Sequence, residues 1–271
     1  MTHPTRSKTN IRSGSGDGIF HFRQSDLELA YQIQFTFLHG SPPTIPDTSL
    51  SGVSLPAQVM GGDYFDFLLT PRGTVRMCVG DVMGKGLAAS MLMLMARVAI
   101  RALSDIADSP GTLLHEANRI LYPDFHRLGS FLTLCFIEYH PATRALACAN
   151  AGHLRPLIYR SAREIVEVDV NGMMMGVLPD SSYEVTSLTL SPGDTVILYS
   201  DGVIEATRPD RQPIGKRGFY EILRGLPPEL PLPVLQERVL QALRQHTGAQ
   251  PQRDDMTLAF LRAGAPADQK V

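Results

Sequence analysis

The sequence has little net charge, no long hydrophobic run and no signal peptide, and each absence excludes a class of protein. A net charge of −2 at pH 7 gives no electrostatic reason to expect binding to nucleic acid or to an anionic membrane. The longest apolar run, GLAASMLMLMA at 86–96, is too short to span a bilayer. The N-terminus lacks the apolar core of a signal peptide. We therefore expect a cytoplasmic protein that binds neither nucleic acid nor membrane.

Cysteine is also scarce. The three cysteines, Cys78, Cys135 and Cys148, lie in apolar runs and show no CxxC spacing. An odd number without metal-ligand spacing argues against both a disulfide framework and a zinc site. We expect buried thiols in a reducing compartment.

Composition divides the chain into four parts. The first is polar and rich in Gly and Ser, which predicts disorder. A helix and a Pro-rich linker follow, then one large domain and a short second tail. The predicted boundaries are 1–18 for the disordered tail, 19–50 for the helix and linker, 51–264 for the domain and 265–271 for the last tail.

The predicted N-terminal helix begins with a capping-box pair, Ser25 and Glu28, and runs to about Leu38. Four apolar residues form one stripe along it: Leu27, Tyr31, Phe35 and Leu38. A helix of about fourteen residues is marginal alone, so this stripe must bury against a neighbour. That neighbour is either the chain's own domain or a second chain.

Beyond residue 51 the pattern is mostly short strands with a few helices. We predict strands at 73–82, 131–140, 144–150, 155–160, 164–169, 183–190, 194–202 and in the closing DMTLAFLR. We predict helices at 86–104, 110–122, 216–224 and 233–246. Consecutive strands on short connections argue for antiparallel sheets with helices on the outside, an α+β fold.

Acidic residues meet apolar strands at four places: Asp63 after Gly61-Gly62, Asp81, Asp201 and the Asp254–Asp255 pair. Alternation along a strand puts Asp81 and Asp201 each on one face with the apolar residues two and four positions earlier. Buried, unpaired carboxylates are costly, so acids that converge need cations. All-oxygen ligation without nearby His or Cys suits Mg²⁺ or Mn²⁺ rather than zinc.

Five motifs occur in order over residues 51–262: GGDYFDF, GDVMGKGLAASMLM, NAGHLRP, LYSDGVIEA and DDMTL. Together they resemble the PP2C-type (PPM) metal-dependent protein phosphatases, specifically the bacterial SpoIIE/RsbU branch. The resemblance implies an α-β-β-α sandwich of two antiparallel sheets flanked by helices, with two Mn²⁺ or Mg²⁺ ions at one edge. It implies hydrolysis of phosphoserine or phosphothreonine on a partner-switching regulator, a STAS-type anti-sigma-factor antagonist, by attack of a metal-bridged water. In similar proteins the segment before the catalytic domain often pairs between chains, which favours a homodimer through residues 25–38.

The resemblance also implies a role for each acid. Asp63 and Asp81 are the expected catalytic residues: Asp63 would ligate the second metal, and Asp81 would bridge both with help from the Val82 carbonyl. Asp201 and one aspartate of the final pair would complete the first metal. For that position we prefer Asp254, with Asp255 as the alternative.

Neighbouring residues complete the predicted site. Gly62, Gly202 and His153 are candidates for its outer shell, although a turn His bonded to backbone is an equal reading of His153. Asp66 is expected to be structural. Eukaryotic members have Asp-Gly-His where this chain has Asp81, Val82 and Met83, so the His considered as general acid there is absent.

Three rival interpretations are weaker. GKGLAA at 84–89 matches a dinucleotide-binding motif, but Asp105 does not end a second strand as that fold requires. A P-loop fails because Gly80 and Gly84 are one residue too close, and because Gly86 replaces the Ser or Thr after Lys85. A phosphatase-like binding module that has lost catalysis would lack a ligand, whereas here every acidic position is filled.

Overall fold

The computed structural model describes residues 9–12, 19–22, 24–38 and 42–264, in two compact units, Met1–Gly40 and Ser41–Val271. In the first unit, strands β1 (Thr9–Arg12) and β2 (Ile19–Phe22) pair antiparallel, and helix α1 spans Gln24–Leu38. The predicted helix is present, with Ser25 inside its first turn rather than before it.

Only part of the two predicted tails lies within the described residues. Strand β1 lies within the stretch predicted to be disordered, and its pairing with β2 gives its backbone groups partners. The remainder of the tail at 1–18, apart from β1, and the tail at 265–271 lie outside the described residues.

Two antiparallel five-stranded sheets form the second unit. The first has the order β10 (Thr186–Thr189), β7 (Ala145–Ala151), β6 (Leu132–His140), β5 (Val75–Val82) and β4 (Asp63–Leu69). The second has the order β3 (Thr48–Leu55), β12 (Met256–Ala263), β11 (Thr195–Tyr199), β8 (Leu157–Tyr159) and β9 (Ile165–Glu167).

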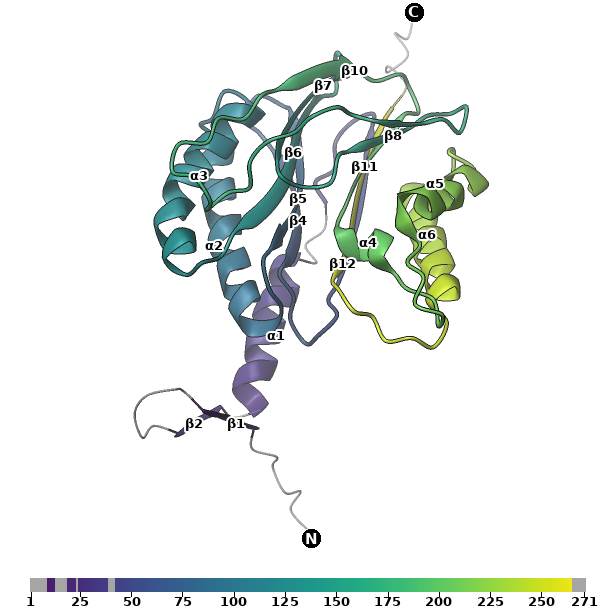
Figure 1. Ribbon diagram of the computed structural model, residues 1–271. Helices are drawn as coiled ribbons and strands as arrows, with labels where there is room; N and C mark the ends of the chain where they lie inside the picture. The colour runs from purple at the N-terminus through teal and green to yellow at the C-terminus, as the bar shows by residue number, and fades with distance from the viewer. Residues whose placement is uncertain (1–8, 13–18, 23, 39–41, 265–271) are drawn as a thin grey trace, which may run out of the picture. The chain divides into compact units, whose positions relative to one another are not determined.

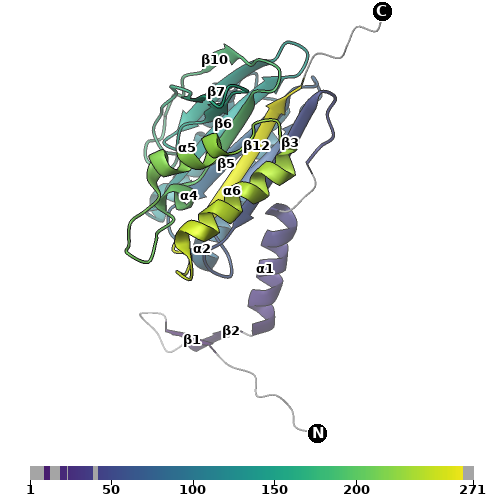
Figure 2. The same ribbon diagram turned by 90° about the vertical axis from the view of Figure 1, so that its right-hand side faces the viewer.

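Helices cover the outer face of each sheet (Figure 1). Helices α2 (Gly86–Ser104) and α3 (Pro110–Arg127) pack on the first sheet. Helices α5 (Gly215–Gly225) and α6 (Leu232–Thr247) cover the second, as Figure 2 shows with α6 lying over β12 and β3. A short helix, α4 (Asp201–Glu205), follows β11. The predicted α-β-β-α sandwich is confirmed.

Strand alternation explains the layers. Val75, Met77 and Val79 point into the core between the sheets, where they meet Val196 and Leu198 from β11. The intervening β11 residues, Ile197 and Tyr199, instead pack with Phe219 of α5 and Leu235 of α6. The three cysteines are buried free thiols, as predicted.

Helix α2 is the one described helix long and apolar enough to meet a length-and-composition criterion for a membrane span. A buried core helix meets the same criterion, and α2 packs against β4, β5 and α3. We therefore treat α2 as a core helix of the sandwich.

Three predicted boundaries are wrong. The domain begins before residue 51, because β3 starts at Thr48 and Ile45 is buried in the core between the sheets. Helix α3 continues past 122, through Pro123, and buries Phe125 in its last turns. Asp201 begins helix α4 and does not continue the strand, so strand alternation does not set its direction.

Candidate active site

Two aspartates stand directly opposite each other at one end of the first sheet. Asp63 opens β4 and Asp81 lies near the end of β5, and the two are cross-strand partners. Like charges in such a pair repel. The Asp63 carboxylate is 2% exposed, and its Oδ2 is buried without a hydrogen-bond partner in the described part of the chain. Burial and the charge of Asp81 raise the pKa of Asp63 well above its usual value, and the nearby side chains of Ser200 and Thr257 lower it only in part.

The second sheet brings further acids to the same end. Strands β11 and β12 are antiparallel, so the end of β11, before Asp201, lies beside the start of β12, after Asp254 and Asp255. Burial and the charges of these three aspartates raise the pKa of Asp81 to about 7. Burial and Asp254 also raise the pKa of Asp201. These aspartates therefore lie at the same end of the sandwich.

Asp254 and Asp255 make different contacts. The Asp255 carboxylate is buried and accepts hydrogen bonds from the backbone N–H groups of Ala57 at 2.7 Å and Gly62 at 2.8 Å. Asp254 is partly exposed, and its Oδ2 lies 2.7 Å from the Lys85 ammonium. Asp255 thus anchors the loop before Asp63. Asp254 instead accepts the backbone N–H of Asp255 at its Oδ1 and pairs with Lys85 through its Oδ2.

The two glycines proposed for the outer shell allow close backbone contacts. A Cβ on Gly62 would lie 2.7 Å from the Val82 carbonyl oxygen, so a side chain there would block that oxygen. A Cβ on Gly202 would collide with the Asp255 carbonyl. Glycine at both positions keeps the chain close enough for the acids to meet.

Asp66 points away from this cluster. Its carboxylate receives two hydrogen bonds from Arg101 of α2, at 2.6 and 2.7 Å, and lies 3.6 Å from Arg97. This bidentate pair ties α2 to β4. The contacts support the structural role expected for Asp66.

His153 links strands β6 and β11 by hydrogen bonds. Its Nδ1 bonds the Thr133 hydroxyl at 2.8 Å, and its Nε2 bonds the Tyr199 carbonyl at 3.2 Å. Burial lowers the pKa of His153 to about 4, so the ring is neutral at pH 7. Of the two readings left open by the sequence, these contacts favour the backbone-bonded one.

The oxygen donors suit a hard divalent cation. Among the described residues, no three Asp, Glu, His or Cys side chains already form a closed ligand group. The raised pKa values of Asp63, Asp81 and Asp201, together with the unpartnered Asp63 Oδ2, nevertheless mark carboxyl groups whose charge the described neighbours compensate only in part. Divalent cations would supply that compensation, so the residues present fit them.

The sequence interpretation missed Lys85 and Ser200 as parts of this site. The sequence marks Lys85 only through its place in the nucleotide-binding patterns and its position between two glycines after Asp81. Ser200 is fully buried, donates to the Asp255 carbonyl and lowers the pKa of the neighbouring Asp63. No feature of the sequence around Ser200 indicates that it belongs to the site.

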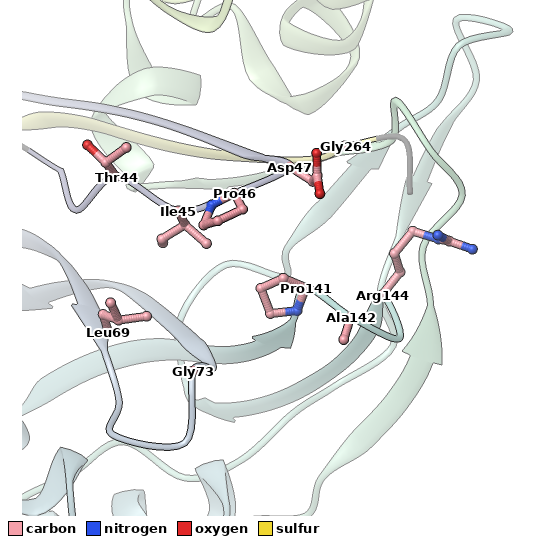
Figure 3. Close-up of a pocket in the computed structure, with 10 residues that line it drawn as sticks. All are labelled: Thr44, Ile45, Pro46, Asp47, Leu69, Gly73, Pro141, Ala142, Arg144 and Gly264. Carbon is pink, nitrogen blue, oxygen red and sulfur yellow. The ribbon is translucent and has the colours of Figure 1, made fainter. Parts of the chain in front are cut away.

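A hollow of about 560 Å³ lies at the opposite end of the strands, since β4 runs from Asp63 toward Leu69 (Figure 3). Its walls are mainly apolar. The lining residues are Thr44, Ile45, Pro46, Asp47, Leu69, Gly73, Pro141, Ala142, Arg144 and Gly264. None of the predicted site residues belongs to it.

Residues 71–264 match the family described as stage II sporulation protein E (SpoIIE), which is more than half of the chain. The chain belongs to the SpoIIE family. Among curated proteins, this SpoIIE-family chain is 28% identical over 204 residues to phosphoserine phosphatase RsbU of Bacillus subtilis, covering 72% of the chain and 60% of RsbU. It is 21% identical over 234 residues to phosphoserine phosphatase RsbP of the same organism, covering 85% and 56%.

Solved structures share the fold of this SpoIIE-family chain. The PP2C domain of SiaA from Pseudomonas aeruginosa superposes with a TM-score of 0.75 at 23% identity, covering 88% of this chain and 96% of that one. The fold is therefore that of PP2C domains. The chain spans about 60% or less of the two curated relatives' lengths.

Proposed function

We propose that this protein is a metal-dependent protein phosphatase that hydrolyses phosphoserine or phosphothreonine. The observation that carries the proposal is the cross-strand pair Asp63–Asp81, joined by Asp201 and Asp254 at one end of the sandwich. The names of RsbU and RsbP, both phosphoserine phosphatases, support the reaction class.

Asp63, Asp81, Asp201, Asp254 and the Val82 carbonyl would hold two ions, Mn²⁺ or Mg²⁺. The bound ions would supply an activated water and neutralise the oxygens of the phosphoryl group. Asp255 would act through the loop that it anchors, because its oxygens already accept backbone N–H groups.

The described residues near the acids offer no free protein nucleophile. Ser200 is buried and donates to the Asp255 carbonyl, while the Thr257 hydroxyl donates to Ser54. All three cysteines are buried, and burial raises the pKa of Cys148 to about 12. These contacts favour direct hydrolysis by water over a covalent phosphoenzyme.

The substrate we propose is a phosphorylated STAS-type regulator in a partner-switching pathway. The sequence shows no basic tract that would read a short peptide, which favours recognition of a folded phosphoprotein surface. The similarity to RsbU supports a regulatory protein as the substrate. We place the reaction in the cytoplasm.

Hydrolysis of p-nitrophenyl phosphate, followed by release of phosphate from phosphorylated STAS proteins, tests this function. Both reactions should require added Mn²⁺ or Mg²⁺ and stop with chelator. Full activity after exhaustive chelation would refute the metal dependence. Tight binding of phosphorylated partners without any turnover would instead establish the alternative, a catalytically silent binding module. Rapid turnover of nucleotides or sugar phosphates alone would refute the protein substrate.

We further propose that α1 joins two chains into a homodimer. Apolar residues are exposed on more than one face of this helix, among them Leu29, Tyr31, Ile33, Phe35 and Phe37. Burial of such side chains contributes roughly 1.5–3 kcal/mol each before ordering costs. That is enough to support weak association.

A further inference from the structure

The side chain of Lys85 brings a positive charge into the cluster of aspartates. Its Nζ lies 2.7 Å from Asp254 Oδ2 and donates a 2.6 Å hydrogen bond to the Arg253 carbonyl. The same charge lowers the pKa values of Asp81 and Asp201, although burial and the neighbouring carboxylates outweigh it. The charge of Lys85 therefore acts on the carboxyl groups of the site.

The backbone fixes where Lys85 leaves the chain. It is extended, with φ −140° and ψ 162°, and stands immediately before helix α2. The flanking residues Gly84 and Gly86 have φ of +103° and +72°, which side-chain-bearing residues rarely adopt. The Lys85 side chain is 37% exposed. Its ammonium thus lies at the mouth of the site, reachable both by the aspartates and from solvent.

Charge balance indicates what this ammonium does. When all four are ionised, Asp63, Asp81, Asp201 and Asp254 carry four negative charges, which two divalent ions would neutralise. The incoming phosphate monoester is a dianion and needs further positive charge. A divalent cation bound to Asp254 would weaken the ion pair between Asp254 and Lys85, because one carboxylate charge would then attract two cations.

We propose that Lys85 binds the phosphoryl group of the substrate, and that Asp254 holds its ammonium until a divalent ion takes that carboxylate. The proposal rests on the phosphatase function above for the identity of the substrate. Its two parts concern binding alone, so each is measurable without turnover.

The first test is a calorimetric titration of the metal-free protein with Mg²⁺. Lys85→Met should bind Mg²⁺ about 2- to 5-fold more tightly than the wild type, because no ion pair has to be broken. Lys85→Arg should stay near the wild type. Lys216→Met removes the same charge from helix α5, where Lys216 pairs with Glu167 of β9, and should change nothing. Equal or weaker Mg²⁺ binding by Lys85→Met would overturn the proposal.

The second test is a titration of the Mg²⁺-loaded proteins with inorganic phosphate. Lys85→Met should lose about 10-fold or more in phosphate affinity, as expected for one charge-assisted hydrogen bond, and Lys85→Arg should retain most of it. Wild-type phosphate affinity in Lys85→Met would overturn the proposal. If both tests succeed but the wild type hydrolyses no phosphoprotein, the proposed function fails and the role of Lys85 in phosphate binding stands.

Discussion

The two ends of strand β5 carry buried charges of different kinds. Near its start, Arg76 faces Glu138 across the β5–β6 register and forms a buried salt bridge with it. Arg76 also donates to the carbonyls of Ser104, the last residue of α2, and of Ala107 beyond it. Near the other end, Asp81 faces Asp63, a charge of the same sign. One pair is neutralised within the protein, and the other is not.

The difference separates a structural site from a functional one. The Arg76–Glu138 pair satisfies its own charge and ties the sheet to the end of α2. Holding the aspartates together costs folding free energy, which Lys85 offsets only in part and external cations would offset further. The hollow near Leu69 and Gly73 shows no such cluster of like charges among the residues that line it.

The largest expected effect comes from removing the like-charge pair. Asp81→Asn should lower kcat/KM for p-nitrophenyl phosphate on the order of 10³-fold, since it removes the acid expected to serve both ions. Asp63→Asn and Asp201→Asn should cost on the order of 10²-fold. The metal-free Asp81→Asn protein should be more stable at pH 7 by about 1–3 kcal/mol, because the raised pKa of Asp81 reports a destabilising charge. Steady-state kinetics and denaturant unfolding measure the two effects.

Asp66→Asn is the matched control, with the same chemical change on β4, the strand that carries Asp63. It should keep most activity where it remains folded, because Asp66 contacts Arg101 and Arg97 instead of the other aspartates. Equal loss of activity in folded Asp66→Asn and Asp81→Asn would contradict the assignment.

Removing the charge of Glu138 from its pair with Arg76 should lower the stability of the fold without lowering its activity. Glu138→Gln leaves the Arg76 guanidinium buried without its countercharge, which costs about 3–5 kcal/mol for such pairs. The activity per folded molecule should stay near the wild type. Urea unfolding combined with kinetics checks this, and a stability loss below 1 kcal/mol, roughly that of an exposed pair, would contradict it.

Acid should weaken the fold through His153. Its pKa is about 4 in the native protein and about 6.5 in an unfolded chain, so only the unfolded state binds the proton between these values. The stability that the buried neutral ring of His153 contributes is complete above pH 6.5 and declines as the pH falls toward 4. From pH 7 to pH 5 the wild type should lose about 2 kcal/mol more than His153→Gln. Equal pH slopes in the two proteins would contradict burial of a neutral ring.

The smallest effect should be on association. Phe35 is 45% exposed on α1 and Tyr31 is exposed one turn before it. Changing both to Glu should shift a dimer to a monomer in sedimentation and leave hydrolysis intact. Gln32→Glu adds charge at an exposed polar position of the same helix and should keep the dimer. A wild type that sediments as a monomer at high micromolar concentration would refute the dimer.

The sequence predicts most of this fold because its strands are apolar and separated by clear turns. Helix α2 begins and ends where its apolar pattern does. Asp201 shows the limit, since strand alternation cannot reveal that a helix begins at that residue. The different contacts of Asp254 and Asp255 could not be predicted from the sequence either. They depend on the backbone N–H groups of Ala57 and Gly62, almost two hundred residues away. Long-range contacts of this kind leave no local pattern.

The number of divalent ions that the chain binds tests the central claim most directly. Calorimetric titration of metal-free wild type with Mn²⁺ should give two ions per chain, together with a rise in melting temperature, because the ions neutralise Asp63, Asp81, Asp201 and Asp254. Asp81→Asn should lose at least one ion. A wild type that binds no Mn²⁺ at millimolar concentration, or an Asp81→Asn variant that binds as many ions as the wild type, would contradict the account.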